Sequence, residues 1–169
     1  MTRRAVVQKW ILYSLCALAL VLVQSLLLVL VQLWGVHPFL LPAIAVIPVT
    51  LERDEGALLF SVFFGLACDL LTPVAGLPCF YALAFLVSGG LAWLLSGRVV
   101  AAGLVCSLAA AASALVVCGV LHLAVLAGSQ SVDVTAAAVL AGKEAALSLP
   151  LTVLVHYPFR RICLLTQRD

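Results

Sequence analysis

The run FSVFFGLACDLLTPVAGLPCFYAL (residues 60–83) holds an apolar segment of helix length with one acid, Asp69, then a Thr/Pro/Gly break and a second apolar segment. Ser61, Gly65 and Asp69 are spaced by four, so on a helix they lie along one stripe. Small residues at this spacing let a second helix approach closely, which favours helix association in a bilayer. A carboxylate there needs a partner or water, because a charge facing lipid at mid-depth costs about 2.5–3.5 kcal/mol or more. The run therefore predicts closely packed helices within a membrane.

The composition of the whole chain indicates a membrane protein. Of its 169 residues, 66% are hydrophobic, against about 45–50% in soluble domains. Only 9% are charged, and the net charge is +2. This composition excludes a water-soluble globule, and the chain has no basic footprint for nucleic acid. We expect a single all-α, polytopic integral membrane domain over residues 1–169, in contact with the lipid bilayer.

Apolar segments alternate with polar or Pro/Gly breaks along the chain. They predict six transmembrane helices, at residues 10–33, 37–51, 56–71, 74–95, 99–127 and 134–157. The first has 24 residues and would reach about 36 Å, enough to cross about 30 Å of hydrocarbon. The second has 15 residues and three prolines, and a helix of that length covers only about 22 Å. It is either a kinked or partly extended span or a re-entrant segment.

The basic residues decide between these alternatives. With six spans, one side of the membrane collects eight of the nine basic residues: Arg3, Arg4, Lys9, Arg53, Arg98, Arg160, Arg161 and Arg168. The opposite loops hold none. A re-entrant second segment would place several of these arginines outside, against the positive-inside rule. The sequence thus predicts six spans with both termini in the cytoplasm.

Two of the predicted helices carry small residues at every fourth position. These are Ala84, Ser88, Ala92 and Ser96 in the fourth span, and Gly103, Ser107 and Ala111 in the fifth. Such ridges permit close helix contact. We therefore expect the fourth and fifth helices to pack along them.

Lys143 and Glu144 lie nine to ten residues into the last predicted span, about 14 Å from its outer end. Neighbours on a helix point about 100° apart, so each of the two needs its own partner. We expect Lys143 to extend toward Asp69 and link the third and sixth helices. For Asp69 two roles stay open: a packing or partner-binding point, or an acid that caps the turn before Pro73. A structural tie is favoured over an ion site, because an ion pathway normally shows more than one acid at depth.

The residues suggest no metal, no cofactor and no catalytic centre. Three histidines (His37, His122 and His156) are scattered without i, i+4 pairing, and six cysteines (Cys16, Cys68, Cys79, Cys106, Cys118 and Cys163) show no C-x-x-C. The cysteines act as small hydrophobes, with acylation a weak alternative for Cys163. No nucleophile motif or phosphate loop is present. We expect a protein that is not an enzyme.

The central part of the chain resembles the MreD family, small integral membrane proteins of the bacterial rod-shape (elongation) system. The matching positions are a proline in the short second segment (Pro38 or Pro42), Gly65, Leu66, Asp69, Leu70 and Leu71, and Gly76 after the break. Family members often have Gly where this chain has Ser61, a small-for-small difference. Chain length, two short central spans and the charge layout are also similar.

The resemblance implies a non-catalytic scaffold in the bacterial cytoplasmic membrane that supports lateral peptidoglycan synthesis and cell shape. It implies an MreC-like partner, and MreB, RodA and a class B penicillin-binding protein as further members of the elongasome. It also implies an S-component-like bundle. The helix-packing or partner-facing candidates are Ser61, Gly65, Asp69, Gly76, Ala84, Ser88, Ala92, Lys143 and Glu144.

Two other functions compete with the scaffold. The main alternative is the substrate-binding S component of an energy-coupling-factor vitamin transporter, which is a six-helix bundle of similar length. Such a protein needs polar groups in its outer loops, where this chain offers little beyond His37, Gln130 and Asp133. The third class is an intramembrane enzyme or ion carrier that uses Asp69 with Lys143 and Glu144.

Overall fold

The computed structural model describes residues 3–28, 30, 35–72, 78–98, 103–128 and 134–166. These residues form six α-helices and one π-helical turn: α1 (Arg3–Val23), continued by η1 (Gln24–Leu28), α2 (Leu41–Glu52), α3 (Glu55–Leu71), α4 (Phe80–Arg98), α5 (Leu104–Gly128) and α6 (Val134–Thr166). The expected all-α fold is confirmed for this part of the chain.

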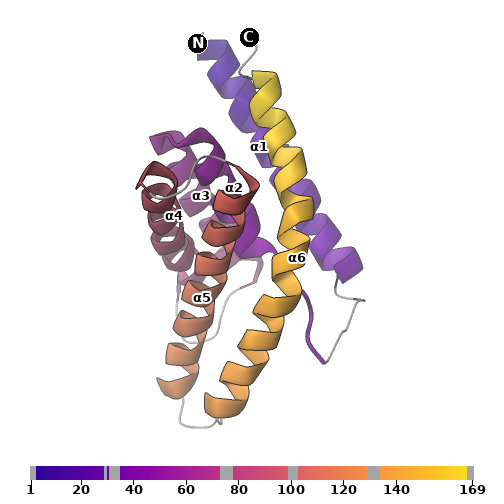
Figure 1. The fold of residues 1–169 in the computed structure, drawn as a ribbon, viewed down its shortest axis with the longest axis vertical. Helices are drawn as coiled ribbons and strands as arrows, with labels where there is room; N and C mark the ends of the chain where they lie inside the picture. Colours follow the sequence, from indigo (N-terminus) through magenta and orange to yellow (C-terminus); the bar gives the residue numbers. More distant parts are fainter. Residues whose placement is uncertain are drawn as a thin grey trace.

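The helices form a bundle in which the two termini lie at the same end (Figure 1). We call this the terminal end. Helix α1 starts there and packs against α6, which finishes there. Helix α5 runs away from the terminal end and α6 returns toward it, while α3 and α4 pack as a pair on the other flank.

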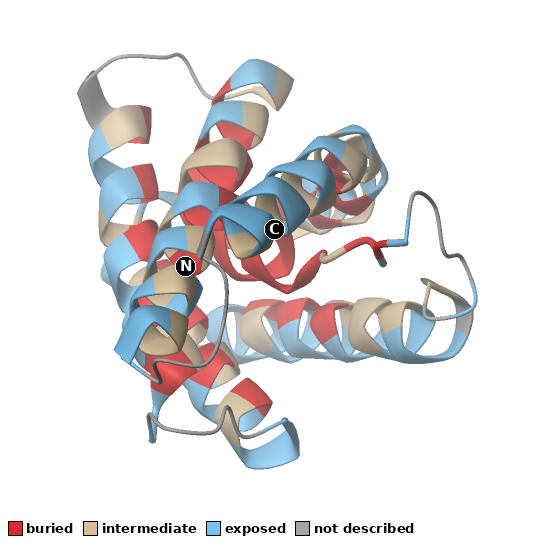
Figure 2. Ribbon diagram, turned by 90° about the horizontal axis from the view of Figure 1, so that it is seen from below, coloured by how far each residue is buried: buried red, intermediate tan, exposed pale blue. Residues whose placement is uncertain are grey.

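Helix α2 is the centre of the bundle. It contacts α1, α3, α4, α5 and α6, and every residue from Leu41 to Thr50 is buried. In Figure 2 the buried residues accordingly gather toward the middle of the molecule. A helix that is apolar on all sides belongs in such a position. Pro42 fits its first turn, where the missing N–H would have no partner, and the left-handed Arg53 (φ 55°) ends it.

The chain enters α2 through a non-helical segment, residues 35–40. Two of its N–H groups are held by side chains: Phe39 donates to Ser148 Oγ at 2.8 Å and Leu40 to Gln24 Oε1 at 3.0 Å. Irregular backbone inside a membrane protein needs such partners. The second predicted span is thus a partly extended segment followed by a 12-residue helix.

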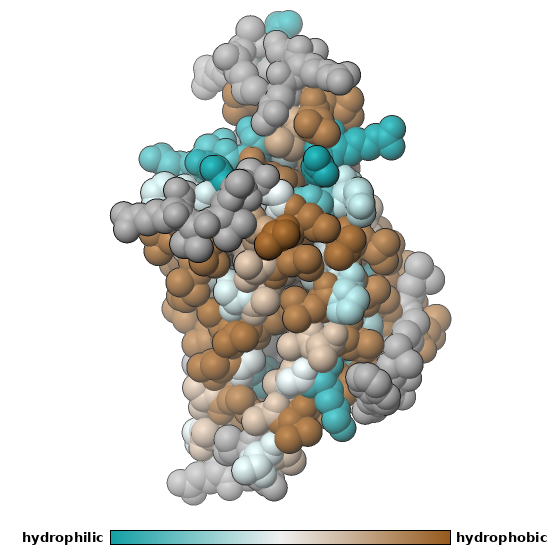
Figure 3. Space-filling model, in the orientation of Figure 1, coloured by the Kyte–Doolittle hydropathy of each residue, from teal (hydrophilic) through white to brown (hydrophobic). Residues whose placement is uncertain are grey.

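Three helical stretches are long and apolar enough to cross a membrane: Val6–Leu26, Leu104–Gly128 and Thr135–Thr166. Two shorter apolar helical stretches accompany them, Leu41–Glu52 and Phe80–Ser96. The visible surface is correspondingly hydrophobic over most of its height, with hydrophilic residues gathered in a band near the terminal end (Figure 3). The chain therefore has the helices of a membrane protein.

Some helix boundaries differ from the predicted ones. The structure starts α4 at Phe80 and α5 at Leu104, while residues 74–77 and 99–102 of the predicted spans lie outside the described part. The last helix was predicted to end at Tyr157 but continues to Thr166. Arg160 and Arg161 are therefore exposed residues of α6 and not a separate tail. A proline inside a membrane helix costs little when neighbouring groups replace the lost hydrogen bond, so Pro158 does not end α6.

Candidate functional site

The carboxylate of Asp69 holds the beginning of the next helix. Its Oδ1 accepts the backbone N–H of Tyr81 at 2.8 Å, and its Oδ2 accepts that of Ala82 at 2.9 Å. Both donors lie in the first turn of α4, where the N–H groups have no partner within the helix and the dipole favours a negative charge. Asp69 therefore caps α4 from α3, across the break, and does not cap the turn before Pro73.

Gly65 and Ser61 bring α3 and α4 close together on the same stripe. A Cβ on Gly65 would lie 2.7 Å from Ala82 Cα and 2.7 Å from the Tyr81 carbonyl oxygen. No side chain fits there, because both neighbours are backbone atoms. One turn earlier, buried Ser61 donates a hydrogen bond to the Phe85 carbonyl oxygen at 3.1 Å. The stripe that the sequence pointed to is thus the contact between α3 and α4.

The small-residue ridge of α4 lies inside the bundle. Ala84, Ser88 and Ala92 are fully buried, and Ser88 donates to the carbonyl oxygen of Ala84 at 2.6 Å. Helix α4 packs against α2, α3 and α5. These positions therefore serve contacts within the chain. Gly76, which was grouped with them, lies outside the described residues.

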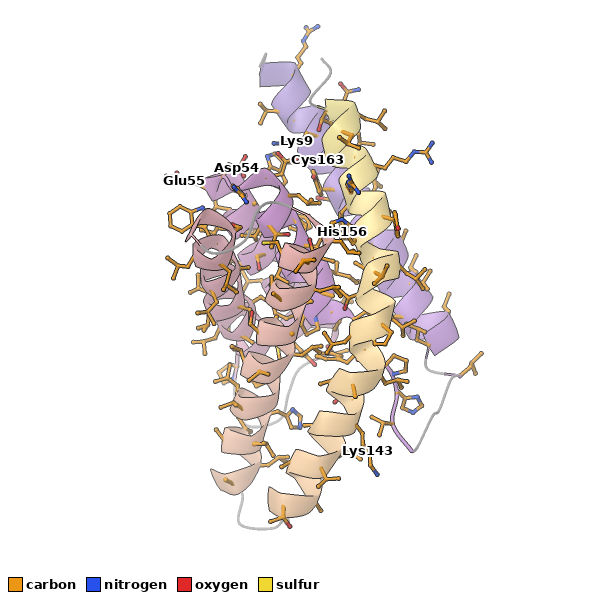
Figure 4. All side chains as sticks on the ribbon, in the orientation of Figure 1. Lys9, Asp54, Glu55, Lys143, His156 and Cys163 are labelled. Carbon is orange, nitrogen blue, oxygen red and sulfur yellow. The ribbon has the colours of Figure 1, made fainter. Side chains whose placement is uncertain are left out.

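The expected tie between Lys143 and Asp69 is wrong. Both carboxylate oxygens of Asp69 are engaged by the first turn of α4, and no ion pair joins Asp69 to Lys143 in the described part of the chain. Lys143 is exposed on α6, far from the terminal end (Figure 4). Its long stem lets the ammonium reach a polar boundary without an internal partner.

A polar cluster that the sequence did not suggest lies at the terminal end. Lys9 Nζ of α1 is 2.9 Å from Glu52 Oε2 at the end of α2, and their side chains are only 6% and 8% exposed. Tyr13 donates to Glu52 Oε1 at 2.8 Å, and Lys9 lies 3.6 Å from Asp54 Oδ2. Figure 4 shows Lys9 and Asp54 in this region, with Cys163 of α6 nearby.

The charged turn at residues 52–55 contributes Glu52 and Asp54 to this cluster. Four charged residues in a row predict a turn that is exposed at the cytoplasmic side. Arg53 and Glu55 are exposed, but Glu52 turns inward and Asp54 caps α3 by accepting the Ala57 N–H at 2.8 Å. The signal for the inward pair was present, because Lys9 and Tyr13 are four apart and share one face of α1.

A second buried network crosses the bundle centre. Ser107 Oγ of α5 lies 3.0 Å from Thr50 Oγ1 of α2 and 2.9 Å from His156 Nδ1 of α6. All three residues are buried, and His156 Nε2 has no hydrogen-bond partner within the described residues. Ser107 had been assigned to a ridge against α4, whereas its hydroxyl joins α2 to α6. These contacts link α2, α5 and α6 at the bundle centre.

A cavity of about 200 Å³ lies in the half of the bundle away from the terminal end. The start of α4, the second half of α5 and the first half of α6 enclose it, together with Phe39 ahead of α2. Its polar lining comes from Glu144, His122, Tyr81 and Cys118. Glu144 thus faces this cavity, while its neighbour Lys143 points elsewhere.

The remaining histidines and cysteines form no metal centre among the described residues. None of the six cysteines, all of which lie within the described residues, forms a disulfide, and Cys79 is the exposed one. Burial of the others agrees with a packing role. The chain matches no protein-family model, no curated protein and no solved structure.

Proposed function

We propose that the chain is a non-catalytic membrane scaffold of the bacterial rod-shape complex, of the MreD type. The observation that carries the proposal is the junction of Gly65 and Asp69 with the first turn of α4. These residues carry the resemblance, and together they build one structural unit. Pro42, another matching position, lies in the buried first turn of central α2.

The proposed topology has six spans with both termini in the cytoplasm. The short α2 does not oppose this, because its 12 residues cover about 18 Å and the non-helical residues 35–40 ahead of it add to that length. The neighbouring helices shield α2, which is buried from Leu41 to Thr50. Side chains hold the N–H groups of Phe39 and Leu40 ahead of it, as the bilayer requires for irregular backbone. Arg4, Arg160 and Arg161 are exposed toward the terminal end, which we assign to the cytoplasm.

The outer surface of the bundle is suited to helical membrane partners. Large apolar side chains are exposed along α1, for example Leu15, Leu18 and Leu22, each more than half exposed. In a bilayer such a face meets lipid or the membrane helix of another protein. An MreC-like protein with one span and a large outer domain is the proposed partner, with MreB, RodA and a class B penicillin-binding protein in the same assembly.

An S component of a vitamin transporter is the weaker assignment. Pockets that enclose drug-sized ligands measure about 300–1,000 Å³. The cavity beside Glu144 has about 200 Å³. A cavity of this volume suits a ligand smaller than a vitamin.

Depletion in the rod-shaped host tests the proposal. Loss of the protein should give round cells with lateral wall synthesis reduced, and a wild-type copy should restore rods. A Gly90→Ala copy should restore them equally, because nothing lies within 4 Å of a Cβ at Gly90. Gly65→Ala should restore them poorly. Depleted cells that keep their rod shape and their wall synthesis would refute the scaffold function.

A further inference from the structure

Glu144 differs from the other acids that the structure places inside the bundle. Glu52 is paired with Lys9 and Tyr13, and Asp69 accepts two backbone N–H groups. Within the described residues no hydrogen bond or ion pair holds the Glu144 carboxylate, although the residue is half-buried. The exposed His37 is the basic group that acts on it electrostatically. A charged acid in an apolar bundle is costly without a partner, and a cation from outside the chain would reduce that cost.

Part of the wall of the cavity around Glu144 is aromatic. Phe39 and Tyr81 have ring centroids 6.3 Å apart, Tyr81 and Phe80 5.2 Å apart, and Phe80 and His122 6.1 Å apart. Aromatic faces attract cations, most strongly when the cation has left water. A carboxylate beside a row of rings is therefore the chemistry that recognises an organic ammonium group.

The volume of the cavity and the polar groups in its lining limit the kind of molecule that it can bind. A hard metal ion such as Ca²⁺ needs about six or more oxygen ligands, whereas the cavity offers one carboxylate and one tyrosine among mostly apolar residues. A dry cavity of about 150 Å³ admits benzene, and this one measures about 200 Å³. The space fits one small ring or a short alkyl chain.

We propose that this cavity binds a small organic ammonium, with Glu144 as its counter-ion and the rings of Phe39, Phe80 and Tyr81 as its wall. The same chemistry is offered by a free amine and by the ethanolamine headgroup of a lipid. The site is distinct from the scaffold function, because its counter-ion Glu144 and most of its lining lie on α5 and α6. It shares only Phe80 and Tyr81, in the first turn of α4, with the α3–α4 junction.

Calorimetry on the full chain in phosphatidylglycerol nanodiscs tests the site. Benzylamine should bind at least tenfold more tightly than benzyl alcohol, its neutral counterpart of the same size. Glu144→Gln should abolish this preference, whereas Lys143→Met, at the neighbouring exposed position, should keep it. Equal binding of the two probes, no binding of benzylamine, or an unchanged preference in Glu144→Gln would overturn the proposal.

Thermal unfolding without ligand gives a second readout. An unpaired carboxylate costs stability, so Glu144→Gln should raise the midpoint of unfolding while it removes the preference for benzylamine. A lowered midpoint would show that Glu144 has an internal partner and would overturn the proposal. Nanodiscs with added phosphatidylethanolamine distinguish a lipid headgroup from a free amine as the natural ligand. If the lipid headgroup occupies the cavity, benzylamine should bind more weakly in these nanodiscs. If the ligand is a free amine, benzylamine binding should be unchanged.

Discussion

The carboxylate of Asp69 in α3 accepts the backbone N–H of Tyr81 in α4 at 2.8 Å, so one helix supplies the N-terminal cap of the next. The N–H groups in the first turn of a helix have no partner within that helix, and those of Tyr81 and Ala82 find theirs in this carboxylate. This relation explains why an acid stands at the end of an otherwise apolar helix. It also makes the break between α3 and α4 dependent on one side chain.

Removing the cap should therefore weaken the bundle. Asp69→Ala leaves two N–H groups without their acceptor, and we expect a loss of about 1–3 kcal/mol in the free energy of unfolding. Asp69→Asn keeps one oxygen acceptor and should lose less. Unfolding by SDS in mixed micelles measures both. Equal stability of Asp69→Ala and wild type would contradict the assigned cap.

The same measurement distinguishes this cap from a pairing with Lys143. Because the two side chains do not meet, the effects of Asp69→Asn and Lys143→Met should add within about 0.5 kcal/mol. A coupling energy well above that value would restore the pairing that the structure contradicts.

Gly65 should not tolerate even one methyl group. Its Cβ would meet backbone atoms of Tyr81 and Ala82 at 2.7 Å, so Gly65→Ala must push α3 and α4 apart. Overpacking of this kind costs about 1–3 kcal/mol. Gly90→Ala is the matched control in α4 and should be neutral or slightly stabilising, because alanine favours helix. Similar unfolding curves for the two variants would argue against close contact at Gly65.

The buried pair of Lys9 and Glu52 should behave as a unit. Lys9→Met leaves the Glu52 carboxylate buried without its cation, although Tyr13 still donates to it, and breaking such a pair costs about 3–5 kcal/mol. The double variant Lys9→Met/Glu52→Gln should be more stable than Lys9→Met alone, since it removes the uncompensated charge. Lys143→Met, an exposed lysine, serves as control and should change little. If the double variant were the least stable of all, the pairing would be refuted.

The proposed topology can be checked with the native cysteines. Cys79 is exposed next to the start of α4, and the other five cysteines are buried or half-buried. A membrane-impermeant maleimide should label intact cells expressing the wild-type chain but not those expressing Cys79→Ser. A cysteine placed at exposed Arg161 in that background should react only after the membrane is opened. Labelling of position 161 in intact cells would contradict a cytoplasmic C-terminus.

The sequence predicted the helical fold and the α3 stripe because both depend on local patterns. Residues spaced by four share a helix face, and Ser61, Gly65 and Asp69 do lie together along α4. What they contact could not be derived from spacing alone. The first turn of α4 lies across a Pro/Gly break whose path depends on tertiary packing.

Long-range partners were the part that the sequence did not reveal. Lys143 and Glu144 are adjacent in sequence but face different surroundings, one exposed and one toward a cavity. His156 and Ser107 are 49 residues apart, and only the crossing of α5 and α6 brings them together. The physical rule that a buried polar group needs a partner held for Nδ1 of His156 but not for its Nε2 within the described residues, and it does not say which helix provides that partner.

Native mass spectrometry of the protein, purified from its own membranes in mild detergent, tests the scaffold function most directly. We expect a stoichiometric complex with a single-span protein that carries a large outer domain. Retention of a vitamin-sized molecule, or of a membrane partner coupled to an ATPase, would contradict the scaffold and identify a transporter component.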